Sequence, residues 1–175
     1  ENYNLNSRLF YMFFDDKSLK NKNIYDFLPN LRENKKKFKI VGISRLVPSK
    51  KFDILIEAIF KLQDNFKKNV ELTLIGSGPE KEILKEIANK KKISLRHYQN
   101  ISKSRLLYIL KKSNLLVAPS ILEGDCGWAP CEAIFSNIPI IVSDIEVTRE
   151  FLKDGAIYFE KNNSDDLAIK IKKFI

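Results

Sequence analysis

From residue 38 to residue 175 the hydrophobic positions follow two alternating patterns. Short apolar runs rich in β-branched residues, typical of strands, alternate with longer segments whose apolar residues recur every three or four positions, as on one face of a helix. The predicted strands are 38–44, 70–76, 93–98, 114–120, 138–144 and 156–160. The predicted helices are 52–66, 76–90, 102–113, 130–136, 146–154 and 164–175. This alternation predicts an α/β fold with a doubly wound, parallel six-stranded sheet.

Particular residues mark the expected helix ends and buried faces. Ser102 and Ser164 are expected N-caps, and Pro130 is expected to open its helix. The buried stripe of helix 52–66 is expected to comprise Ile54, Leu55, Ala58, Ile59 and Leu62. Ligands of such folds bind beyond the carboxyl ends of the strands, so the loops at those ends are the candidate sites.

Residues 1–37 do not follow the alternation. We expect a lead-in or linker segment there, followed by one domain over residues 38–175. The chain begins with Glu1 rather than Met, and it ends on Phe174 and Ile175 inside a helical pattern. It is therefore expected to be a piece of a longer protein.

Composition narrows the class of protein. With 44% hydrophobic and 30% charged residues the chain is expected to be a globular, cytoplasmic domain, and no apolar run approaches the ~18–20 residues of a membrane span. The net charge of +9 raises the question of nucleic acid. Lysines are spread over nearly all the predicted helices, however, and the runs 35–37 and 90–92 lack interleaved aromatic residues. No nucleic-acid partner is expected.

The cysteines do not indicate a metal site. Cys126 and Cys131 are close in sequence, but the only histidine, His97, is far upstream. Two thiols without such partners make a poor metal site, so reduced cysteines are expected.

Two of the loops at the carboxyl ends of strands offer candidate phosphate contacts. Arg45 and Lys50 both lie in the first strand-to-helix turn, where a guanidinium and an ammonium group suit a diphosphate. In the second loop, Gly76 and Gly78 allow the backbone to come close to a ligand or to a neighbouring strand, which is a weak signal alone.

The third loop, EGDCGWAPCEA (123–133), combines glycines with a helix start. Gly124 and Gly127 permit a tight loop, and the helix that Pro130 is expected to open would present its N–H groups and positive dipole end to an anion. The pattern favours phosphate binding at a helix N-terminus.

Two carboxylates flank that helix start. Glu132, expected in the first helical turn, can accept hydrogen bonds from ribose hydroxyls, and Glu123 can accept them from a sugar. The alternatives are that Glu132 only stabilises the helix N-terminus and that Trp128 is a buried packing residue.

Four segments in order, 41–59, 72–88, 115–144 and 150–171, resemble the C-terminal domain of retaining group 1 glycosyltransferases of the GT-B class. The resemblance covers about 38–175. It implies one half of a two-domain enzyme in which two Rossmann-like domains face each other across a cleft. The C-terminal domain binds the nucleotide-sugar donor, and an N-terminal domain of the same chain binds the acceptor.

The resemblance implies residue roles. Arg45 and Lys50 match the basic pair that holds the donor diphosphate, and the backbone at Gly127 and Trp128 matches the segment that contacts the donor phosphates. Glu132 matches the second glutamate of the family's paired-glutamate motif, which binds the nucleotide ribose.

The first glutamate of that motif is displaced. Eight residues separate Glu123 from Glu132, one more than is usual, so either Glu123 or Asp125 is expected to contact the donor sugar in the catalytic role. Asn137 and residues 99–100 stand where the family commonly has glycine. The donor base and sugar are therefore not predicted.

Taken with these residues, the resemblance implies transfer of a glycosyl group, of the hexosyltransferase class, from a nucleoside-diphosphate donor with retention at the anomeric carbon. Cations and helix N–H groups would stabilise the leaving diphosphate, so neither a metal nor another cofactor is expected. The isolated domain is expected to bind nucleotide and to be inactive alone, and its basic surface is compatible with peripheral association with an anionic membrane. The alternatives are a nucleotide-sugar epimerase of the same fold and a non-enzymatic basic module that binds nucleic acid or protein.

Overall fold

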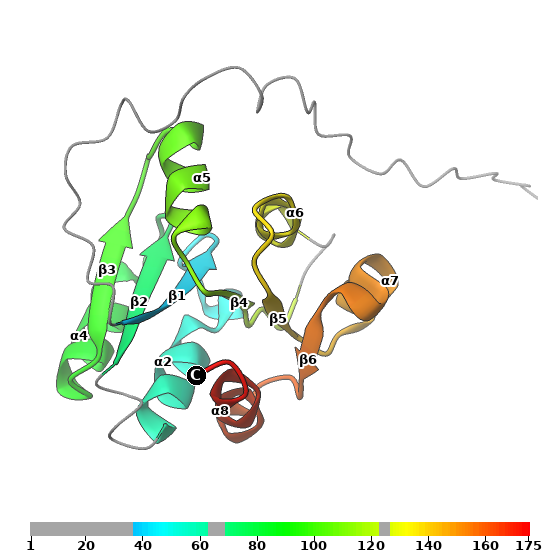
Figure 1. Cartoon of the computed structure of the whole chain (residues 1–175). Helices are drawn as coiled ribbons and strands as arrows, with labels where there is room; N and C mark the ends of the chain where they lie inside the picture. The colour runs from blue at the N-terminus through cyan, green and yellow to red at the C-terminus, as the bar shows by residue number, and fades with distance from the viewer. Residues whose placement is uncertain (1–36, 63–68, 123–126) are drawn as a thin grey trace, which may run out of the picture. The chain divides into compact units, whose positions relative to one another are not determined.

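A computed structural model describes residues 37–62, 69–122 and 127–175 of the chain (Figure 1). Nearly all of the predicted lead-in 1–37, the end of the predicted helix 52–66 and the segment 123–126 lie outside these residues. The predicted domain boundary therefore stays a prediction.

The described residues form the predicted parallel sheet. Its strands are β1 (Phe38–Ile43), β2 (Val70–Ile75), β3 (Ser94–Tyr98), β4 (Leu115–Ala118), β5 (Ile140–Ser143) and β6 (Ile157–Phe159). Every neighbouring pair is parallel, and the order across the sheet is β3-β2-β1-β4-β5-β6. The predicted α/β fold class is confirmed. The strand order reverses direction between β1 and β4, and such a switch point is where ligands of these folds bind.

Helices follow the strands as predicted. They are α2 (Phe52–Lys61), α4 (Lys81–Lys90), α5 (Lys103–Lys111), α6 (Trp128–Phe135), α7 (Glu146–Leu152) and α8 (Ser164–Lys172), with 3-10 turns η2 (Pro48–Lys50) and η3 (Lys153–Gly155). Figure 1 shows α2 and α8 side by side on one side of the sheet, with α5 and α6 on the other. No helix among the described residues is both long enough and apolar enough to cross a bilayer.

The core lies between the sheet and its helices. The central strands are buried on both faces, as Ile40, Val41, Leu116 and Val117 show. Each such side chain stabilises the fold by about 1.5–3 kcal/mol. The predicted stripe of α2 is buried except for Ile54, which is only partly buried, while Phe52 and Ile56 are buried and were not predicted. The core face is therefore wider than the sequence pattern indicates.

Most helix bounds differ from prediction by a few residues, and three of the differences concern residues singled out in the sequence or the end of the first helix. α2 ends at Lys61, because the backbone of Leu62 is extended. α6 begins at Trp128, so Pro130 is its third residue rather than its first. α8 is capped by Asn163, whose side chain accepts hydrogen bonds from the N–H groups of Asp165 and Asp166, and not by Ser164. The predicted cap Ser102 on α5 is confirmed.

Candidate functional site

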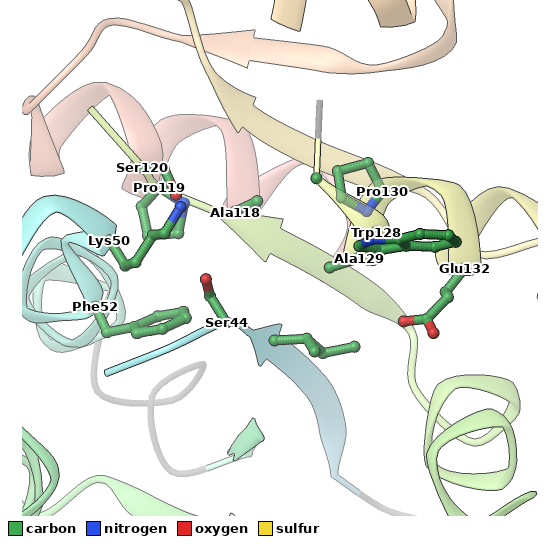
Figure 2. A pocket seen from close by; sticks show the side chains of 12 residues that line it. Ser44, Lys50, Phe52, Ala118, Pro119, Ser120, Trp128, Ala129, Pro130 and Glu132 are labelled. Atoms are coloured by element: carbon green, nitrogen blue, oxygen red, sulfur yellow. The ribbon is translucent and has the colours of Figure 1, made fainter. Parts of the chain in front are cut away.

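A cavity of about 240 Å³ lies at the switch point between β1 and β4 (Figure 2). It is lined by the carboxyl ends of these two strands, by η2, by the start of α2 and by the first turns of α6. Sequence reasoning placed its candidate residues in these loops, and the structure brings four of them, Lys50, Gly127, Trp128 and Glu132, to this one cavity.

Lys50 reaches the cavity from η2. The residue is only 8% exposed, although lysine is normally a surface residue. Pro48 opens the 3-10 turn, and Lys51 adopts a left-handed conformation at φ 52° that turns the chain into α2. The local backbone therefore directs Lys50 inward.

Two glycines allow the β2–α4 loop to pack against the loop that carries Lys50. A Cβ atom on Gly76 would collide with the backbone carbonyl of Ser44, and one on Gly78 would collide with that of Leu46. Both glycines have positive φ angles, of 144° and 158°. Of the two predicted reasons for these glycines, the close approach of a neighbouring segment is the one that the structure shows.

Hydrogen bonds fix the Lys50 loop from two directions. The Leu46 N–H donates to the Ser77 carbonyl over 2.8 Å, and the Glu80 N–H donates to the Leu46 carbonyl over 3.1 Å. On the other side the Ile121 N–H, beyond β4, donates to the Ser49 carbonyl over 2.9 Å. The loop is thereby preorganised by backbone contacts that need no ligand.

Arg45 lies in the same loop but differs from Lys50. It is exposed and is not among the described residues that line the cavity. Its assignment to the donor diphosphate stays a prediction.

The N-terminus of α6 borders the cavity. Gly127 precedes the helix with φ 71° and ψ 160°, a conformation that strongly favours glycine. Among the described residues no side chain caps this helix, and its first turn contains no acidic residue. Pro130 is the third residue of α6. The first residues of any helix have N–H groups without a partner inside the helix, so the N–H that proline lacks costs no helical hydrogen bond. The positive end of the helix dipole can therefore act on an anion in the cavity.

Glu132 lines the cavity from the same helix. Because α6 begins at Trp128, Glu132 lies beyond the first turn, and the prediction that placed it there is wrong. Helix N-terminal stabilisation is therefore a poor explanation for this residue. Burial raises the pKa of its carboxyl group, and the Lys103 ammonium at the start of α5 acts in the opposite direction.

Trp128 is not a packing residue. It is 55% exposed, and it borders the cavity at the first position of α6. The alternative that it is buried is wrong.

The other predicted contacts on this loop cannot be placed. Glu123, Gly124, Asp125 and Cys126 lie outside the described residues. Cys131 carries a thiol and not a disulfide. Within the described ranges no three His, Cys, Asp or Glu side chains come together in a group that could hold a metal ion.

Sequence reasoning missed the floor of the cavity. The ring of Phe52 lines it, and a Cβ atom on Gly42 would lie 2.6 Å from Cε1 of that ring. The signal was a glycine inside an apolar strand, which often marks a close approach. Its partner is in the next helix and could not be named from the pattern alone.

Known proteins resemble the chain over most of its length. Residues 25–175 match the model of the family described as glycosyl transferases group 1. The O-antigen chain mannosyltransferase RfbU of Salmonella typhimurium is 32% identical, and the match covers 69% of this chain and 42% of that protein. The chain spans about two fifths of the length of the first curated relatives that it matches.

Solved structures share the fold. The catalytic domain of cholesterol-alpha-glucosyltransferase from Helicobacter pylori superposes with a TM-score of 0.67 at 30% identity, covering 78% of this chain and 85% of that chain. TarM of S. aureus, solved in complex with UDP among other ligands, gives a TM-score of 0.65 at 28% identity, covering 83% of this chain and 31% of that chain.

Proposed function

This chain belongs to the group 1 glycosyl transferases, and we propose that it is the donor-binding half of a retaining enzyme of that family. The observation that carries the proposal is the cavity at the strand switch point, which has Lys50 on one side and the N-terminus of α6 on the other (Figure 2). A nucleoside-diphosphate sugar would bind there. UDP bound to relatives such as TarM supports this class of ligand.

The diphosphate would lie between Lys50 and α6. Negative charge grows on the diphosphate as the bond to the sugar breaks, and a fixed ammonium group with helix N–H donors would stabilise that charge. Because the Lys50 loop is already held by hydrogen bonds to the loops after β2 and β4, no reorganisation is needed at the moment of reaction. Arg45, from the same loop, would supply a second cation.

The ribose would lie beside Glu132. An ionised carboxylate accepts hydrogen bonds from two neighbouring hydroxyls. Partial burial raises the pKa of the Glu132 carboxyl group and leaves it poorly hydrated, so hydrogen bonds from ribose hydroxyls would stabilise its ionised form.

The transferred sugar would lie toward residues 123–126, with Glu123 or Asp125 contacting it. We propose that no divalent metal is required, because Lys50 and the helix dipole carry the positive charge that the leaving group needs. Donor binding that is unchanged by EDTA would agree with this, and restoration of binding by added Mg²⁺ or Mn²⁺ would contradict it.

The remaining partners are an acceptor-binding N-terminal domain of the same polypeptide and, through the basic surface, an anionic membrane. The acceptor would belong to glycan, lipid-linked or polysaccharide biosynthesis, as the name of the RfbU relative suggests.

Calorimetric titration of the chain with UDP and GDP tests the proposal. Lys50→Met removes the charge but keeps an apolar stem of similar length, and it should weaken nucleotide binding roughly 10- to 100-fold. Lys90→Ala, which removes the same charge from an exposed site on α4, is the matched control and should leave binding unchanged. Equal effects of the two substitutions, or tighter binding of an oligonucleotide than of either nucleotide, would contradict the proposal.

A further inference from the structure

We propose that the indole of Trp128 is the surface on which the nucleoside half of the donor packs, with Glu132 holding the ribose hydroxyls beneath it. This inference rests on the proposed function. It assigns to the Trp128 side chain a role distinct from that of the Trp128 backbone, which belongs to the phosphate-facing tip of α6.

The position of Trp128 relative to Glu132 is the first support. The two residues are four apart on α6, so their side chains share one face of the helix, and both line the cavity. Figure 2 shows the indole on the Glu132 side of the cavity, across from Lys50. A ligand that contacts Glu132 from the cavity therefore lies within reach of the indole.

The same geometry indicates which part of the donor lies beside the indole. Lys50 and the tip of α6 mark the place of the diphosphate, whose two ends lead to the nucleoside and to the sugar. The indole lies on the side of Glu132, the residue proposed to hold the ribose, and across the cavity from Lys50. The side chain therefore suits the nucleoside.

Exposure is the second support. A tryptophan that is 55% exposed leaves a large apolar surface in water, and the cavity beside it has further apolar lining from Phe52, Pro119 and Ala129. A base or ribose that packs on the indole removes this surface from water. Stacking of a base on an aromatic side chain contributes to affinity in nucleic-acid complexes, as alanine substitution of such side chains shows.

Trp128 is the only tryptophan in the chain, so its fluorescence reports this contact directly. The chain is titrated with UDP, GDP, inorganic pyrophosphate and glucose 1-phosphate, and the emission is compared with binding measured by calorimetry. We expect UDP or GDP to change the emission, and the affinity obtained from this change should agree with the calorimetric affinity. Pyrophosphate and glucose 1-phosphate should leave the emission unchanged. An equal change with pyrophosphate or glucose 1-phosphate would overturn the inference.

Substitutions give an independent measurement. Trp128→Ala should weaken nucleotide binding about tenfold and leave pyrophosphate binding unchanged, whereas Trp128→Phe, which keeps an aromatic face, should stay within about threefold of the parent chain. Phe135→Ala, at the other end of α6, removes an exposed aromatic side chain away from the cavity and serves as the control.

The outcomes separate this inference from the proposed function. If UDP and GDP bind in a Lys50-dependent manner but Trp128→Ala binds as well as the parent chain, the inference fails and the proposed function stands. If neither nucleotide binds the parent chain, both fail. Circular dichroism shows whether each variant is folded.

Discussion

Both α6 and α8 begin with backbone N–H groups that the helix itself cannot pair, but the surroundings of the two N-termini differ. In α8 the side chain of Asn163 accepts hydrogen bonds from two of these N–H groups, and Asp165 and Asp166 place negative charge in the first turn. In α6 no described side chain acts as a cap, the first turn has no acid, and a cavity with Lys50 on its far side adjoins the helix. The N-terminus of α8 is capped by a side chain of its own fold, whereas that of α6 faces a cavity that suits an external anion.

Placing a carboxylate in the first turn of α6 should produce the largest effect. Trp128→Glu makes this terminus resemble that of α8, and it should stabilise the helix by about 0.3–1 kcal/mol. It should weaken nucleotide binding roughly 100-fold, through loss of the indole surface together with repulsion of the diphosphate. Urea unfolding and calorimetry measure the two quantities. Ile134→Glu, near the end of α6, is the control and should leave affinity nearly unchanged. Nucleotide binding that survives Trp128→Glu would place the anion elsewhere.

Nucleotide should stabilise the fold through α6 in the way that Asn163 stabilises it through α8. At a nucleotide concentration 100 times its dissociation constant, the free energy of unfolding should rise by about 2.7 kcal/mol, and the Tm by about 5–10 °C. Differential scanning calorimetry measures the shift. The same concentration should shift the Tm of Lys50→Met much less, and equal shifts would show that the ligand does not use this cavity.

Removing the cap of α8 should lower stability and leave nucleotide binding unchanged. Asn163→Ala leaves two N–H groups without their acceptor and should lower the free energy of unfolding by about 1 kcal/mol. Asn163→Asp, which keeps the acceptor oxygen, should lose much less. Nucleotide affinity should be the same in all three chains, and a change in affinity would mean that the two termini are coupled.

The smallest effect should come from pH. Because burial raises the pKa of Glu132, the folded state binds this proton more tightly than the unfolded state does. The stability that it contributes is present below the unfolded value of 4.5 and is lost as the pH rises through the higher folded pKa. Nucleotide affinity should rise over the same range, since ribose hydroxyls require the ionised form. In Glu132→Gln the pH dependence of stability and that of nucleotide affinity should both flatten. If the pH profile of nucleotide affinity is unchanged, Glu132 does not contact the ribose.

The contrast between the two termini was only partly visible in the sequence. The alternation predicted each strand and α-helix of the described residues, though not the 3-10 turns η2 and η3, because strands buried on both faces form nearly continuous apolar runs. The exact helix starts were not predicted. Proline is tolerated throughout the first turn, so Pro130 did not reveal that α6 starts at Trp128, and Asn163 and Ser164 are neighbouring residues that both suit an N-cap.

The site was harder to predict than the fold, because its geometry depends on contacts between distant segments. Arg45 and Lys50 were both expected to contact the diphosphate, but of the two only Lys50 is among the residues that line the cavity. The path of their loop is set by hydrogen bonds to Ser77, Glu80 and Ile121, residues that the local pattern does not connect to it.

The bonds that join Leu46 to the β2–α4 loop and Ser49 to the segment after β4 have a consequence for local opening. The amide protons of Leu46, Glu80 and Ile121 come from three different crossovers. All three are held by hydrogen bonds that join the Leu46–Ser49 loop to the two segments beside it. In hydrogen–deuterium exchange these three amides should therefore exchange as a single cooperative unit. Access of water to the floor of the cavity would then be governed by one opening equilibrium and not by three independent ones.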